Sequence, residues 1–286
     1  MMGTPLSIIK DILRCPKCFE KLVTDSKGSI LTCQGDPSHS YPIIDGIPRF
    51  VKREEISPED AHWVFDYDET AEDYDSSVLV YNEWLGIDLV KEFKKAIKEI
   101  PIEPSSRILD VSTGTGNLIF RIMDLHPETK IAFVGVDLSI GMLRVAQRKF
   151  SEAQIAVPIL HTQVMELPFD DDSFDVVTHS GGINTFSDIP AALREWVRVL
   201  KPNGFLWIGD EGISPALRKT RRGAEIMKEN KLFGLQPPLR HLPPQVKNIS
   251  LQWLARDTFY TISCQKLSEE ELRDLSPLKV WFTAEI

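Results

Sequence analysis

The chain has 286 residues, of which 42% are hydrophobic and 26% are charged. This balance is typical of a globular protein with one large core, and it excludes disordered and fibrous proteins. Because 42 acidic residues outnumber 33 basic ones, the net charge is −9, and no overall positive field attracts nucleic acid. No apolar run is long enough for a transmembrane segment, and the first residues lack the pattern of a signal peptide. We therefore expect a cytoplasmic protein.

Three of the four cysteines lie near the N-terminus, as Cys15-Pro-Lys-Cys18 and Cys33. Two thiolates two residues apart on a tight turn suit a tetrahedral Zn²⁺, and His39 offers a fourth ligand from a second turn. The alternatives are buried structural cysteines beside an incidental surface histidine, or a redox pair. A redox pair is expected at the start of a helix after a strand, whereas these cysteines lie between short extended segments. We therefore predict a structural zinc site with no open position for catalysis.

Residues 1–52 are predicted to form a small zinc-ribbon-like domain, because so short a segment cannot bury enough apolar surface to fold without a metal. Basic residues outnumber acidic ones in this segment, which is the only hint of a nucleic-acid partner. The segments Asp11–Cys18 and Tyr41–Pro48 resemble the small zinc-ribbon proteins that bind and activate methyltransferases of the translation machinery. The position of His39, two residues before Tyr41, is similar to that in the zinc finger of a bacterial 23S rRNA guanine methyltransferase.

Residues 53–82 are rich in acidic and aromatic side chains, including Tyr67 and Tyr74. We predict that they form a linker or a lid rather than a core strand. The apolar spacing over Trp84–Ile100 predicts a helix, which Pro101 ends.

Strand and helix patterns alternate over most of the last segment, residues 83–286. Strands are expected at Arg107–Val111, Ile131–Asp137, Val157–His161, Phe174–His179 and Gly204–Gly209, with helices at Asn117–His126, Ser139–Phe150 and Asp188–Leu200. This alternation is typical of an α/β doubly wound, Rossmann-like sheet that binds ligands at the carboxyl ends of its strands. Val246–Leu254 and Thr258–Cys264 predict an antiparallel hairpin at one edge. The expected sheet is seven-stranded and mostly parallel.

A glycine-rich turn, Ser112-Thr-Gly114-Thr-Gly116, follows Asp110 at the end of the first expected strand, and Asp137 ends the next strand about twenty residues later. Glycines let a ligand approach the backbone, and a helix N-terminus offers free N–H groups. An acid at the end of the second strand accepts hydrogen bonds from ribose hydroxyls. A dinucleotide-binding turn would have a third glycine where Ile119 stands. The pattern therefore favours a nucleoside ligand without phosphates over NAD.

Four motifs resemble those of class I S-adenosylmethionine-dependent methyltransferases, particularly the ubiquinone and menaquinone C-methyltransferases. They are Ile108–Gly116, Gly135–Ser139, Glu166–Val177 and Arg198–Gly204. The resemblance implies that the methionine part of S-adenosylmethionine is held by the first motif, through Asp110, Ser112, Gly114 and Gly116. It also implies that Asp137 binds the ribose and that the adenine contacts Leu138, Gln163 and Val164. Gln163 stands where the family has an acid, and its carbonyl oxygen can accept the same hydrogen bond. Tyr67 and Tyr74 are similar to aromatic residues that fold over the cofactor, with simple packing as an equal alternative.

Methyl transfer needs the donor and the acceptor to be held at near-attack distance in a dry pocket. The segment His179–Asn184 after the fourth strand is expected to face the reactive methyl group, and His179 is a candidate general base. The alternative is a histidine that is hydrogen-bonded at a strand end. Asp210 and Glu211 after the fifth strand are candidate acceptor-site acids. The insert 214–247, with its proline-rich loop, is expected to help select the acceptor.

The preferred hypothesis is a methyltransferase that acts on a small hydrophobic or quinone-like molecule, because the resemblance, the acidic charge and the apolar insert agree. One alternative is an rRNA or tRNA methyltransferase that recognises RNA through the zinc-ribbon-like domain. The other is a noncatalytic cofactor-binding or assembly protein. No pattern in the sequence indicates an oligomeric state.

Overall fold

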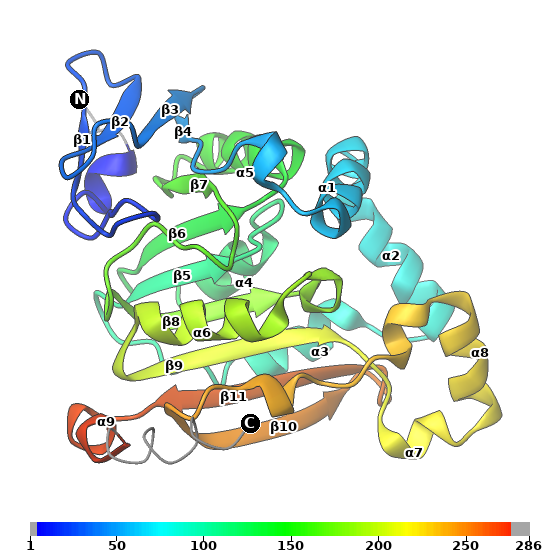
Figure 1. Cartoon of the computed structure of the whole chain (residues 1–286). Coiled ribbons are helices and arrows are strands. Elements are labelled where there is room, and N and C mark those ends of the chain that lie inside the picture. The colour runs from blue at the N-terminus through cyan, green and yellow to red at the C-terminus, as the bar shows by residue number, and fades with distance from the viewer. Residues whose placement is uncertain (1–4, 276–286) are drawn as a thin grey trace.

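The structure, a computed structural model, describes residues 5–275. Residues 1–4 of the predicted zinc-ribbon-like domain and residues 276–286 of the last predicted segment lie outside the described residues. The described chain contains a four-stranded sheet near the N-terminus and a seven-stranded sheet further along (Figure 1). No helix within residues 5–275 is both long and apolar enough to cross a lipid bilayer.

The four-stranded sheet forms a unit that we call the ribbon, residues 5–52. Each of its strands pairs antiparallel with the next. The strands are β1 (Leu22–Thr24), β2 (Ile30–Cys33), β3 (Ser40–Ile44) and β4 (Ile47–Pro48), preceded by the 3₁₀ helix η1 (Pro5–Ile8) and followed by η2 (Arg53–Glu55). The turn before β1 carries Cys15 and Cys18, and the turn after β2 carries His39, so the strands bring the two turns to one end of the ribbon.

The seven-stranded sheet has the strand order β10-β11-β9-β8-β5-β6-β7. Its strands are β5 (Arg107–Val111), β6 (Ala132–Asp137), β7 (Ile159–His161), β8 (Phe174–Ser180), β9 (Leu200–Glu211), β10 (Val246–Leu254) and β11 (Phe259–Lys266). The five strands from β9 to β7 are parallel, whereas β10 and β11 form an antiparallel hairpin whose β11 pairs with β9. The predicted mostly parallel sheet with a C-terminal hairpin is confirmed.

Helices cover both faces of this sheet. One face packs on α3 (Leu89–Ile97), α4 (Asn117–Leu125) and α5 (Ile140–Glu152), and the other on α6 (Ile189–Val199). Successive strand residues alternate between the two cores: Ile108 belongs to the core under α3–α5, while Leu109 and Val111 belong to the core under α6. Because both faces are buried, the strands appear in the sequence as continuous apolar runs.

The ribbon completes the layer that α6 begins. The connection between β7 and β8, residues 162–173, contains no helix, and apolar ribbon residues such as Ile12 and Leu13 join the α6-side core instead. Backbone hydrogen bonds join the two parts, from the Arg14 N–H to the Pro168 carbonyl (2.9 Å) and from the Phe50 N–H to the His161 carbonyl (2.8 Å). The predicted zinc-ribbon-like domain therefore shares one core with the α/β unit.

Residues 53–82 are largely helical rather than an extended linker. Helix α1 (Pro58–Thr70) begins at Ser57, whose hydroxyl accepts a hydrogen bond from the Asp60 N–H (3.0 Å), and α2 (Tyr74–Leu85) follows. The predicted helix over Trp84–Ile100 is wrong at its start. Gly86, with a φ of 64°, ends α2, and α3 begins only at Leu89.

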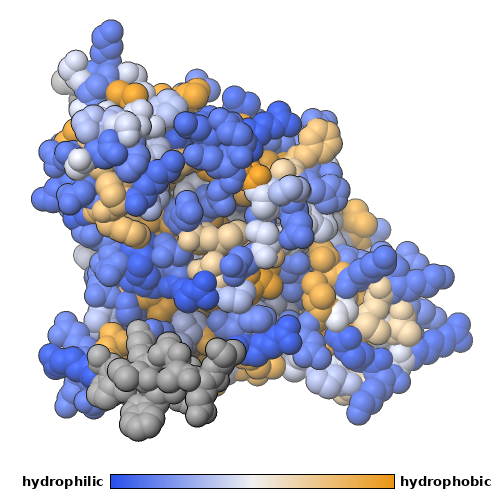
Figure 2. Space-filling model, in the orientation of Figure 1, coloured by the Kyte–Doolittle hydropathy of each residue, from blue (hydrophilic) through white to orange (hydrophobic). Residues whose placement is uncertain are grey.

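The insert between β9 and β10 extends the molecule beyond α2, at the right of Figure 1. It contains α7 (Pro215–Arg218), α8 (Arg221–Glu229), η4 (Lys231–Gly234) and η5 (Leu239–His241); η3 (Ile183–Thr185) precedes α6, and α9 (Glu269–Leu275) follows β11. On the face shown in Figure 2, apolar residues are scattered among hydrophilic ones. Scattered apolar residues of this kind are usual on a globular surface.

Candidate functional site

A large cavity lies at the carboxyl ends of the parallel strands, under α1 and α2. Its volume is about 1150 Å³. Small-ligand sites typically measure about 300–1000 Å³, so this cavity has room for a cofactor and a second ligand together. The strand ends that line it include Asp110, Asp137, Ser180 and Asp210. Its position is the one expected for a doubly wound sheet.

Asp137 holds the glycine turn with both of its carboxylate oxygens. One oxygen accepts a hydrogen bond from the Gly114 N–H (2.8 Å), and the other accepts one from the Ser139 N–H (2.8 Å). Each oxygen can still accept a further hydrogen bond, and the side chain lines the cavity. Burial raises the pKa of Asp137 to about 6, against the lowering effect of these backbone donors. The residue is therefore suited to hold the two hydroxyls of a ribose.

Asp110 is buried at the floor of the cavity. Its carboxylate accepts hydrogen bonds from the Thr113 hydroxyl (2.7 Å) and the Thr178 hydroxyl (2.8 Å). Burial raises its pKa to about 7. Because the two threonines come from the turn and from β8, Asp110 fixes the turn to the neighbouring strand.

Ser112 and the two glycines of the turn have left-handed backbone conformations, with φ of 54° at Ser112 and Gly114 and 82° at Gly116. Ser112 and Gly114 line the cavity, as a cofactor-binding turn requires. Gly116 is not among the lining residues. A Cβ atom there would lie 2.5 Å from Cζ of Phe150, so this glycine allows α4 to pack closely on α5. The sequence interpretation missed this close packing.

Replacing Gly116 by alanine is expected to lower the free energy of unfolding by about 3 kcal/mol, because positive φ and overpacking add. Gly114→Ala is the matched control, since nothing lies within 4 Å of its added Cβ, and we expect a loss of about 1 kcal/mol. Urea unfolding of both variants measures the difference. Equal losses would show that contact with Phe150 does not matter.

The wall beside the end of β6 contains Leu138, Gln163 and Val164, the three residues assigned to adenine by resemblance. Val164 is buried, and Met142 of α5 completes an apolar surface against which a base can pack. The amide nitrogen of Gln163 donates a hydrogen bond to the Glu55 carbonyl (3.3 Å). Its amide oxygen has no recorded partner in the described chain and suits an adenine amino group.

Helices α1 and α2 close the cavity, and we call them the lid. Tyr67 and Tyr74 line the cavity from the lid and also pack against the small cluster of Ala71, Met142 and Val145. Two acids of the lid, Asp68 and Asp75, fix it to the elements beneath it. Asp68 accepts hydrogen bonds from the Ser139 hydroxyl (2.5 Å) and the Gly141 N–H (2.8 Å). Asp75 accepts hydrogen bonds from Thr115, Asn117 and Lys149 (2.6–2.7 Å). These acids, which the sequence interpretation treated only as part of an acidic segment, attach the lid to the glycine turn and to α5.

His179 does not face the cavity. Its ring is fully buried 5.0 Å from the ring of Trp196, and its Nδ1 donates a hydrogen bond to the Val111 carbonyl (3.0 Å). Burial lowers its pKa to about 4. The prediction of a general base at His179 is therefore not supported, because the side chain points into the α6-side core. The alternative, a histidine hydrogen-bonded at a strand end, describes what the structure shows.

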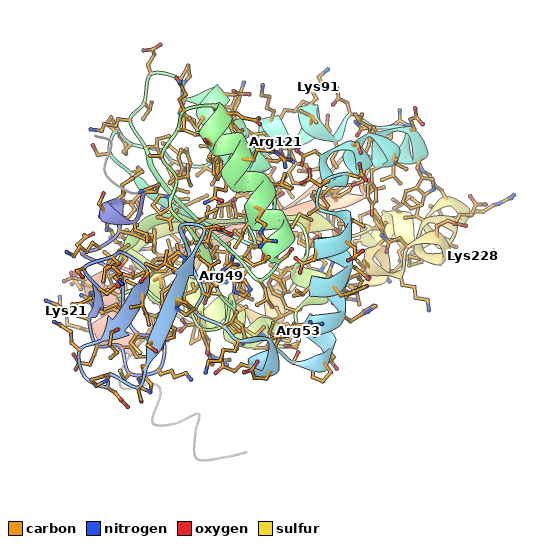
Figure 3. The ribbon with its side chains drawn as sticks, turned by 90° about the horizontal axis from the view of Figure 1, so that it is seen from above. Lys21, Arg49, Arg53, Lys91, Arg121 and Lys228 are labelled. Carbon is orange, nitrogen blue, oxygen red and sulfur yellow. The ribbon has the colours of Figure 1, made fainter. Side chains whose placement is uncertain are left out.

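The other end of the cavity lies beside β9. Asp210 and Glu211 line it, as expected, and the Asp210 carboxylate accepts hydrogen bonds from the N–H groups of Gly182 (3.3 Å) and Ile183 (2.9 Å). From the insert, residues 228–232 contribute to the lining, whereas the proline-rich loop 234–244 does not. Arg121 of α4, which Figure 3 labels, also lines the cavity, and the sequence analysis did not single it out. Its position at the start of the second turn of the helix that follows the glycines was the available signal.

The ribbon brings Cys15, Cys18, Cys33 and His39 together, and their ligand atoms all lie within 4.8 Å of one another. The Cys18 and Cys33 sulfurs are 3.3 Å apart, and the Cys15 sulfur lies 3.6 Å from Nδ1 of His39. Zinc–sulfur bonds of about 2.3 Å place two thiolates of a tetrahedral site about 3.8 Å apart. The donor set and its compactness therefore fit a four-coordinate zinc ion.

The chain is similar to curated demethylmenaquinone methyltransferases. It is 38% identical over 145 residues to a demethylmenaquinone methyltransferase of Chlorobaculum tepidum, in an alignment that covers 50% of this chain and 56% of the relative. It is 35% identical over 154 residues to a demethylmenaquinone methyltransferase of Listeria monocytogenes, with 53% and 62% covered. The matched region thus spans less than two thirds of these relatives.

Among solved structures, a possible exported protein from Bordetella parapertussis is similar in fold, with a TM-score of 0.50 and 16% identity over 62% of this chain and 66% of that one. The model of the ubiE/COQ5 methyltransferase family matches residues 56–213, which include the lid, the strands β5 to β9 and the cavity-lining residues Asp110, Asp137 and Asp210. This match covers more than half of the sequence. The chain therefore belongs to the ubiE/COQ5 methyltransferase family.

Proposed function

We propose that the protein is an S-adenosylmethionine-dependent methyltransferase whose acceptor is a small, hydrophobic, quinone-like molecule. The observation that carries the proposal is one cavity that has Asp137, an acid suited to a ribose, near one end and space for a second ligand at the other. Family membership and the named relatives support methyl transfer to a quinone precursor.

S-adenosylmethionine supplies an electrophilic methyl group. In the proposed complex, Asp137 holds the ribose, Leu138, Gln163 and Val164 surround the adenine, and the turn from Ser112 receives the methionine part. The lid tyrosines Tyr67 and Tyr74 exclude water from the reacting atoms, which strengthens every electrostatic contact inside the cavity. These residues act mainly by positioning, which is the principal requirement for an in-line displacement.

We propose further that the ribbon binds one structural Zn²⁺ through Cys15, Cys18, Cys33 and His39. In this proposal the metal stabilises a layer of the enzyme's own core rather than an RNA-binding module. Two of the ribbon's cations are paired with acids: Arg14 contacts Asp170, and Lys17 lies 3.3 Å from Glu55. Such pairing reduces the positive field available for RNA.

The test uses tritiated S-adenosylmethionine, the purified protein and a cell extract, with separate counting of the RNA, protein and solvent-soluble fractions. A second arm offers a reduced, demethylated menaquinone as the acceptor. We expect label in the solvent fraction and in the methylated quinone. Label confined to RNA would establish the alternative RNA methyltransferase, and tight cofactor binding without turnover in any fraction would establish a noncatalytic protein.

A further inference from the structure

The end of the cavity beside β9 carries a pair of carboxyl groups that cofactor binding does not use. In the strand order, β8 and β5 separate β9 from β6, so the Glu211 end of the sheet lies about 14 Å from the Asp137 end. The glycine turn after β5 lies between them. Glu211 is therefore placed beyond the cofactor-binding residues, in the part of the cavity left for the acceptor.

The two carboxyl groups of the pair differ in their surroundings. Asp210 is 1% exposed and is hydrogen-bonded to three backbone N–H groups, those of Gly182, Ile183 and Glu211. Burial, followed by the charge of Glu211, raises the pKa of Asp210 well above its usual range, and the two side chains are hydrogen-bonded to each other. The three backbone donors fix the Asp210 carboxyl in place, and the half-buried Glu211 lines the cavity next to it.

Glu211 faces an apolar and phenolic environment. Its cross-strand partner is Phe259, which lines the cavity together with Phe93, the two ring centroids being 5.8 Å apart. The phenols of Tyr67 and Tyr74 face it from the lid, and both have pKa values raised by burial and by nearby carboxylates, including Glu211. In the described chain, no side chain other than Asp210 is recorded as a hydrogen-bond donor to the Glu211 carboxylate. It is free to accept a hydrogen bond from a ligand.

Other candidate bases are less suitable. Burial raises the pKa of Tyr67 and of Tyr74, so both phenols keep their protons at neutral pH and are unsuited to act as bases. Asp60 lines the cavity but is occupied by the hydroxyls of Ser57 (2.7 Å) and Ser187 (2.6 Å). His179 is in the core.

We infer that Glu211 is a catalytic residue: the general base that takes the hydroxyl proton of an aromatic acceptor, with Asp210 as its positioning residue. This inference rests on the proposed function. Loss of the hydroxyl proton to Glu211 makes the adjacent ring carbon nucleophilic. A bond then forms between that carbon and the methyl group while the methyl–sulfur bond breaks and S-adenosylhomocysteine leaves. The hydrogen of the methylated carbon moves to the oxygen as aromaticity returns, and the proton on Glu211 passes to solvent.

The first test is kinetic. Glu211→Gln keeps the size of the side chain but cannot accept the proton, so we expect kcat/KM for a reduced demethylated menaquinone to fall about a hundredfold. The affinity for S-adenosylmethionine is expected to stay within twofold. Glu211→Asp is expected to recover part of the activity. The matched control is Glu225→Gln on the exposed face of α8, for which we expect no change.

The second test is a binding measurement that does not depend on turnover. Calorimetry in the presence of S-adenosylhomocysteine compares 1-naphthol, which can donate a hydrogen bond to Glu211, with 1-methoxynaphthalene, which cannot. We expect the wild type to prefer the naphthol about tenfold and Glu211→Leu, whose side chain has no acceptor, to lose that preference. No preference in the wild type, or an unchanged preference in the variant, would overturn the inference. Absence of quinone methylation by the wild type, with the naphthol preference intact, would instead overturn the proposed function.

Discussion

Asp137→Ala is expected to weaken the binding of S-adenosylmethionine about a thousandfold. The variant would lack the two charge-assisted hydrogen bonds that the carboxylate makes to the ribose in the proposed complex, each worth about 1.5–3 kcal/mol. The variant also loses the acceptors that hold the N–H groups of Gly114 and Ser139, so the turn relaxes. Isothermal titration calorimetry measures the affinity. The control is Asp124→Ala on α4, which is not among the cavity-lining residues and is expected to bind normally.

The same carboxylate gives cofactor binding a pH dependence. Burial raises the pKa of Asp137 to about 6, and only the charged form offers all of its lone pairs to the ribose. Affinity should therefore be full at pH 8 and should fall as the pH drops through 6, by about tenfold at pH 5. Asp137→Asn has no such titration at this position. If the wild type bound equally well at pH 5 and pH 8, the ribose contact would not depend on the charge.

Much of the fold follows from the sequence because parallel strands buried on both faces appear as uninterrupted apolar runs. The glycine turn and Asp137 were also predictable, since their backbone and charge requirements are local. The same holds for the cluster of Cys15, Cys18, Cys33 and His39, whose spacing within two turns brought the four residues together.

The predictions from the sequence failed for segments whose local signals were overlooked, and for segments whose placement depends on distant residues. The lid helices were missed because their acids dominated the composition, although Ser57 followed by Pro58 is a helix-start signal. The direction of His179 depends on strand alternation: it shares a face with Val177, which packs under α6. Nothing in residues 1–52 alone indicates that they cover a sheet formed by residues more than 50 positions later. The ribbon can cover the sheet there because the connection between β7 and β8, residues 162–173, contains no helix.

Cys18→Ser, or removal of metal by a strong chelator, is expected to lower the thermal midpoint of the whole protein by about 10 °C. In the proposed zinc site the metal would hold the two turns of the ribbon together, so its loss would release them. Because ribbon residues such as Ile12 and Leu31 pack in one core with Leu109 and Val111, loss of the ribbon would expose one face of the main sheet. A loss of about 3–4 kcal/mol corresponds to this shift for a protein of this size.

Differential scanning calorimetry of the full-length protein, with the zinc content measured by mass spectrometry, tests this prediction. We expect one zinc ion per chain in the wild type and none in Cys18→Ser. The control is Lys17→Ala, which changes the same turn but keeps all four ligands. A metal-free wild type whose midpoint does not respond to the chelator would show that the cluster is not a zinc site. A chelator effect confined to the ribbon, with unchanged unfolding of the main sheet, would instead show that the two parts unfold independently despite their shared core.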